Sequence, residues 1–135
     1  MKTYARWLFG TAAAFNILVG LSLVFLRPLM QARLGIESAE GANLVFANLA
    51  GLLAALLGVI YALIAREPDR YRPIIVLAAL GKLVAVALVV TPWLRGEVGP
   101  QLPALVMGDA LYAALFLDYV RRSRAATPSP PARRR

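Results

Sequence analysis

The sequence predicts an all-α polytopic membrane protein, a bundle of four transmembrane helices. Hydrophobic residues make up 60% of the 135 residues and charged residues only 16%, and the mean hydropathy is +0.67. A soluble domain of this size would bury only about two-thirds of its surface, so the apolar excess indicates that lipid is the solvent. Four apolar stretches, each long enough to cross a hydrocarbon core of about 30 Å, support the same class.

We expect the four spans at residues 7–26, 43–65, 74–94 and 102–120. Lys2 and Arg6 precede the first span, as basic residues precede the apolar core of a signal peptide. That apolar stretch is longer than a signal-peptide core, and no suitable cleavage site follows it. The first span is therefore predicted to be retained in the protein.

Prolines mark the connections between the spans. Arg27-Pro28 ends the first span, because proline lacks an amide donor and disfavours helix in the residue before it. The loop onward to Ala42 has room for a short interfacial helix. Pro68 and Pro73 bound the polar turn between the second and third spans.

The membrane domain is expected to cover residues 1–120. Residues 121–135 are rich in Ser, Pro, Ala and Arg. Such a composition buries too little apolar surface to fold, so a basic, disordered cytoplasmic tail is predicted there, above all over Thr127–Arg135.

Lysine and arginine are unevenly distributed between the two sides of the membrane. One side holds the N-terminus, the middle loop and the tail, with the basic residues Lys2, Arg6, Arg66, Arg70, Arg72, Arg121, Arg122, Arg124, Arg133, Arg134 and Arg135. The other side holds Arg27, Arg33 and Arg95. The positive-inside rule then predicts that both termini lie in the cytoplasm.

Several chemistries are disfavoured by composition. The chain has no Cys and no His, which excludes Ser–His and Cys–His nucleophile systems and the usual zinc ligands. The carboxylates are dispersed, and no glycine-rich phosphate loop is present. We therefore expect no metal, no cofactor and no enzymatic activity. The net charge is +8, but the basic residues do not form a stripe interleaved with aromatic residues. No nucleic-acid partner is therefore expected.

Small residues recur at three- and four-residue intervals along the later spans. Such residues allow close helix approach, which drives association in lipid. The second span carries Ala47, Gly51, Ala54, Ala55, Gly58 and Ala62, the third Gly81 and Ala85, and the fourth Gly108 and Ala113. Two interpretations remain open: packing within one bundle, or a seam that faces a second copy in a homo-oligomer.

Lys82 is the most unusual residue of the chain, since it lies inside an apolar run of membrane length. A charge at this depth costs about 2.5–3.5 kcal/mol on insertion scales. Lys82 is therefore a candidate functional residue. Asp109 is the one acid well inside another apolar run. Counting about 1.5 Å per residue from the cytoplasmic edge places both near the midplane, together with Asn16 and Tyr112.

These four residues form the candidate site. Asp109 and Tyr112 are three residues apart and share a helix face. Three interpretations are open: a buried ion pair between Lys82 and Asp109 that fixes helix register, a polar pocket that binds a ligand or relays a proton, or a lone Lys82 that extends to the headgroups. A separate acid, Asp118, is expected in a local ion pair with Arg121 or Arg122.

The spacing of helix ends and small residues over residues 7–120 resembles the small bacterial four-helix membrane proteins of the DoxX-like kind. The positions concerned are Asn16, Gly20, Leu23, Arg27, Pro28, Leu34, Gly35, Ile36, Gly51, Gly58, Ala65, Arg66, Glu67, Pro68, Trp93 and Gly96. The resemblance implies a compact four-helix membrane bundle. Some relatives are associated with thiosulfate:quinone oxidoreduction or with accessory roles in redox complexes. The resemblance assigns no role to Lys82 or Asp109.

The expected function is that of a small integral protein of the bacterial inner (cytoplasmic) membrane without enzymatic activity, whose polar cluster binds a small molecule or lipid. Two alternatives stay open. One is a structural or accessory subunit of a membrane complex, including a quinone-linked redox complex. The other is a small transporter. The expected partners are the lipid bilayer and either a second copy or another membrane subunit.

Overall fold

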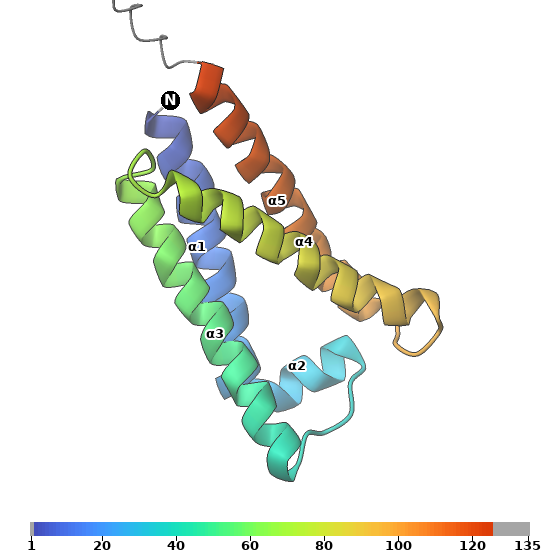
Figure 1. The fold of residues 1–135 in the computed structure, drawn as a ribbon. Helices are drawn as coiled ribbons and strands as arrows, with labels where there is room; N and C mark the ends of the chain where they lie inside the picture. Colours follow the sequence, from blue (N-terminus) through green and yellow to red (C-terminus); the bar gives the residue numbers. More distant parts are fainter. Residues whose placement is uncertain (1, 126–135) are drawn as a thin grey trace, which may run out of the picture.

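The computed structural model describes residues 2–125 and is all-helical, with no strand over that range. Its helices are α1 (Lys2–Phe25), α2 (Arg27–Leu34), α3 (Gly41–Arg66), α4 (Arg72–Leu94) and α5 (Gln101–Ala125) (Figure 1). All but α2 are long and apolar enough to cross a membrane. The predicted fold class, an all-α multi-pass membrane protein, is confirmed.

Proline and glycine set the ends of α2, the short helix within the predicted interfacial loop. Pro28 lies in its first turn, where a missing amide donor costs nothing. Gly35 ends the helix in the left-handed region at φ 65°, and its amide donates to the carbonyl of Gln31. This backbone conformation favours glycine. The first span ends at Phe25, where the proline predicted it.

The helices extend beyond the apolar runs that predicted them. α1 begins at Lys2 and α5 continues past Val120 to Ala125, so the first residues of the predicted tail are helical. Hydropathy marks the part of a helix that lies in lipid, whereas backbone hydrogen bonding continues into the interfacial residues. The rest of the predicted disordered tail, from residue 126, lies outside the described residues.

The four long helices pack as two pairs, α1 with α3 and α4 with α5. The pairs converge at the end that carries the N-terminus, the α3–α4 turn and the end of α5 (Figure 1). They diverge toward the other end, where α2 and the α4–α5 connection lie. The bundle is therefore closed at one end and open at the other.

Glycines bring the backbones of α1 and α3 into direct contact. A Cβ on Gly20 would lie 2.5 Å from the carbonyl oxygen of Gly51 and from the amide nitrogen of Ala55. A Cβ on Gly58 would lie 2.8 Å from the carbonyl oxygen of Ala13. This part of the small-residue seam thus packs within one chain. Gly81 of α4 is different, since nothing lies within 4 Å of its Cβ position.

The core occupies the closed end. Its largest fully buried side chains are Phe9, Tyr61, Ile64, Ile75 and Phe116, contributed by all four long helices. The Phe9 and Phe116 rings lie 4.8 Å apart, and Tyr61 meets Phe116 edge-on at 5.3 Å. Aromatic pairs of this kind stabilise beyond their buried area, so these rings hold the two helix pairs together.

Substitution of two glycines by alanine should have opposite effects on stability. Gly20→Ala places a methyl group against backbone atoms of α3, and overpacking of this kind costs about 1–3 kcal/mol. Gly81→Ala enters open space and should be neutral or stabilising by up to about 1 kcal/mol, because glycine disfavours helix. Thermal unfolding in detergent, followed by tryptophan fluorescence, measures both. Equal effects of the two substitutions would contradict the described α1–α3 packing.

Candidate functional site

Lys82 and Asp109 form an ion pair between α4 and α5. The Lys82 ammonium Nζ donates a hydrogen bond to Asp109 Oδ1. The Lys82 side chain is 5% exposed and the Asp109 side chain 22%. Each charge lies well inside an apolar helix, where an unpaired charge is costly. The pair therefore provides each group with the counter-charge that its depth requires.

Two tyrosine rings complete the surroundings of the ammonium. Lys82 Nζ lies 5.2 Å from the ring centroid of Tyr61 in α3 and 5.8 Å from that of Tyr112 in α5. Both distances fall within the range of cation–π attraction, about 0.5–2 kcal/mol for each pair. Tyr112 contributes the face of its ring, and neither phenol donates a hydrogen bond to the ion pair in the described residues.

Asn16 lies beside the ion pair without joining it. Its side-chain amide donates to the carbonyl oxygen of Ala12, one turn earlier in α1, at 3.0 Å. The residue is 7% exposed and lines the same cavity as Lys82 and Asp109. The structure thus gathers all four predicted residues in one region, but Asn16 retains hydrogen-bonding capacity that the pair does not use.

A cavity of about 560 Å³ extends from this cluster between α3 and α4. Its polar lining consists of Asn16, Tyr61, Lys82 and Asp109. The remaining lining is apolar and comes from the facing sides of α3 and α4: Ala50, Leu53, Ala54, Leu57, Ile60, Ile74, Leu77, Ala78, Gly81 and Ala85.

The apolar margin of this cavity is exposed on the outer surface of the helices. Leu53 and Leu57 of α3 and Ile74 and Leu77 of α4 are all exposed. In a bilayer these positions contact acyl chains, because both helices are of membrane-spanning type. The cavity therefore opens between exposed apolar sides of two helices that are long and apolar enough to cross a membrane.

Tyr61 is a member of this cluster that depth counting missed. The same count of about 1.5 Å per residue places Tyr61 nearer the cytoplasmic edge than Lys82, yet its ring faces the ammonium. α4 is inclined relative to α3 in the bundle (Figure 1), so residues at different counts along their helices meet. A tyrosine within an apolar run was the available signal, but one sequence does not give helix tilt.

Other polar residues meet away from this cluster. Arg27, at the start of α2, donates to the side-chain oxygen of Asn48 in α3. Asp118 pairs with Arg122 at 2.7 Å, one helical turn away. Among residues 2–125, no group of three or more acidic, His or Cys side chains could hold a metal ion.

The chain matches none of the protein-family models, curated proteins or solved structures with which it was compared. The resemblance to DoxX-like proteins therefore stays a prediction.

The Lys82–Asp109 pair should show strong coupling in a double-mutant cycle. Lys82→Met or Asp109→Leu alone leaves one buried charge unpaired, at a cost of about 3–5 kcal/mol. The double variant removes both charges and should recover much of that loss. The measurement is the free energy of unfolding of the four proteins in detergent.

The exposed pair of Asp118 and Arg122 provides the matched control. The same cycle with Asp118→Ala and Arg122→Ala should give a coupling of about 0.3–0.5 kcal/mol, as for other exposed pairs one turn apart. Additive losses at Lys82 and Asp109 would contradict the ion pair.

Proposed function

We propose that this protein is a non-enzymatic membrane binding protein that holds a lipid-soluble small molecule in the cavity between α3 and α4. One observation carries the proposal: an apolar cavity of about 560 Å³ that has a buried ion pair and a partly free amide in its wall. Ligand cavities in proteins measure about 300–1,000 Å³ and combine apolar walls with a few polar groups.

The polar groups favour a ligand with an oxygen-bearing head. The Lys82 ammonium has three N–H donors and directs one to Asp109 Oδ1. The carboxylate has a second oxygen, and the Asn16 amide has a donor and an acceptor beyond its bond to Ala12. Carbonyl and hydroxyl oxygens would pair with these groups, whereas a plain hydrocarbon would leave them unsatisfied. A quinone or quinol ring with an apolar tail combines both requirements.

The position of the cavity supports access from the membrane. Its margin consists of exposed leucine and isoleucine side chains on α3 and α4. A molecule dissolved in the bilayer could reach the ion pair by moving sideways between these helices, without crossing water. The resemblance to DoxX-like proteins, some of which are associated with quinone-linked redox complexes, points to the same class of ligand.

A cavity-filling substitution tests this proposal without touching the ion pair. Gly81→Leu places a side chain into the cavity from a position that has no neighbour within 4 Å. Gly10→Leu is the matched control, because Gly10 is also helical and equally open but lies outside this cavity. A short-chain benzoquinone and a phospholipid serve as probes.

The benzoquinone should raise the unfolding temperature of the wild type and of Gly10→Leu, but not that of Gly81→Leu. A benzoquinone concentration of about 100 times its dissociation constant stabilises the folded protein by about 2.7 kcal/mol. This corresponds to a rise of several degrees in the unfolding temperature. The absence of a shift in the wild type, or an equal shift in Gly81→Leu, would refute the proposal. Stabilisation by a second membrane protein alone would favour the accessory-subunit alternative.

The proposal also includes a bacterial inner-membrane location with both termini in the cytoplasm. The end of the bundle at which the N-terminus and the α3–α4 turn lie together (Figure 1) carries Lys2, Arg6, Arg66 and Arg70. The end with α2 and the α4–α5 connection carries Arg27, Arg33 and Arg95. This asymmetry supports the orientation through the positive-inside rule.

Cysteine labelling tests the orientation directly, because the chain contains no Cys. In intact spheroplasts, a membrane-impermeant maleimide should label Glu37→Cys in the α2–α3 connection and leave Asp69→Cys in the α3–α4 turn unlabelled. Permeabilised cells should label both, which controls for accessibility of the introduced thiol. Labelling of Asp69→Cys alone in intact spheroplasts would show the opposite topology and contradict the proposed orientation.

A further inference from the structure

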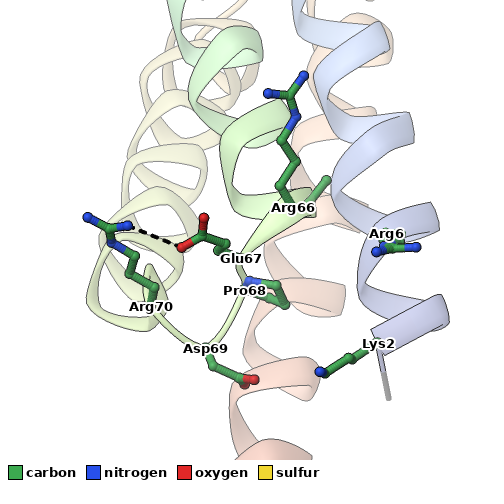
Figure 2. A pocket seen from close by; sticks show the side chains of 8 residues that line it. Lys2, Arg6, Arg66, Glu67, Pro68, Asp69 and Arg70 are labelled. Carbon is green, nitrogen blue, oxygen red and sulfur yellow. Dashed lines mark hydrogen bonds and ion pairs between the residues drawn. The ribbon is translucent and has the colours of Figure 1, made fainter.

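A second cavity, of about 300 Å³, lies at the closed end of the bundle. It forms between the first turns of α1 and the turn that joins α3 to α4 (Figure 2). Its lining residues are Lys2, Arg6, Ala65, Arg66, Glu67, Pro68, Asp69 and Arg70. This cavity is separate from the one between α3 and α4, with which it shares no lining residue.

Positive charge dominates the lining of this second cavity. The lining includes the four cations Lys2, Arg6, Arg66 and Arg70 and the two carboxylates Glu67 and Asp69. Glu67 accepts a hydrogen bond from Arg70 at 3.2 Å, and this bond raises the pKa of the Arg70 guanidinium above its usual value. The carboxylate of Glu67 is therefore already engaged within the turn.

The other cations are less compensated. Figure 2 shows Glu67 and Arg70 directed toward each other, while Lys2 extends from α1 toward Asp69. Arg6 of α1 and Arg66 at the end of α3 have no ion pair with any residue of the 2–125 range. Two arginines that line the cavity thus have no carboxylate partner within that range.

The turn that carries these charges is held in place by its backbone. The amide of Glu67 donates to the carbonyl of Leu63 at 3.3 Å, and the amide of Tyr71 donates to the carbonyl of Glu67 at 3.3 Å. Pro68 is buried at the base of the turn. A fixed turn reduces the entropy that would be lost when an anion binds.

We propose that this cavity binds a phosphate group, presented by the headgroup of an anionic phospholipid. Guanidinium groups pair with phosphate in a bidentate geometry that lysine does not offer, and Arg6 and Arg66 supply two of them. Basic pockets at the cytoplasmic ends of transmembrane helices bind acidic lipid headgroups.

The surroundings of the cavity favour lipid as the source of the phosphate. The cavity lies where α1 begins and α3 ends, at the ends of membrane-spanning segments. Trp7 and Leu63, next to the cavity along α1 and α3, are exposed apolar side chains. Acyl chains attached to the bound headgroup could extend over this surface, whereas free phosphate would gain nothing from it.

The experiment measures phosphatidylglycerol binding to the full-length protein in phosphatidylcholine nanodiscs. The test variant Arg6→Gln/Arg66→Gln removes the two unpaired guanidinium groups. The control Arg33→Gln/Arg121→Gln removes the same charge from exposed positions outside the cavity. A surface basic residue strengthens binding to anionic lipid about fivefold. The test variant removes two such residues from the same end of the bundle and should therefore weaken binding about twentyfold or more. The control removes only Arg121 from that end and should weaken binding at most about fivefold.

Two further arms complete the design. Wild-type binding should weaken as salt rises, because screening acts on exposed charges; an affinity independent of salt would overturn the proposal even if the test variant failed to fold. Inorganic phosphate at millimolar concentration should not displace the lipid. Displacement by phosphate alone would overturn the assignment to a lipid headgroup, and equal losses in the test and control variants would overturn the cavity as the site.

Discussion

The ammonium group of Lys82 is the constraint on which the arrangement of the helices depends. A charge at the middle of an apolar helix requires a counter-charge and polarisable neighbours. Asp109 of α5 supplies the first, and the rings of Tyr61 and Tyr112 supply the second. Since Tyr61 belongs to α3 and the other two to α5, this one group links the α1–α3 pair to the α4–α5 pair.

The cavity follows from the unequal packing of the two ends. Buried aromatic rings fill the space at the closed end, where Phe9, Tyr61 and Phe116 interlock. Between α3 and α4 the cavity remains, and α4 contributes the small residues Ala78, Gly81 and Ala85 to its lining. Small residues that sequence patterning assigns to helix contact therefore serve two purposes. Gly51 and Gly58 pack against α1, whereas Gly81 leaves space.

Sequence reasoning predicted the parts that follow from the cost of charge in lipid. The four spans derive from that cost. The same cost made Asp109 the candidate partner of Lys82, in one of three interpretations that the sequence left open. The contact between the Tyr61 ring and the Lys82 ammonium could not be predicted, because it depends on the tilt of α4. A count of residues along one helix assumes that the neighbouring helices run parallel to it. The observed helix ends also differ from the predicted span ends, since α1 and α5 extend past the apolar residues that hydropathy detects.

The pairing of the helices has a consequence for biogenesis. The α1–α3 pair is joined by backbone contacts of Gly20, Gly51 and Gly58 and is complete once α3 has been synthesised. α4 follows with the charge of Lys82, and its counter-ion Asp109 lies in α5, which the ribosome makes last. The third and fourth spans therefore gain from leaving the translocon together, as a hairpin whose charges neutralise each other before either helix meets bulk lipid.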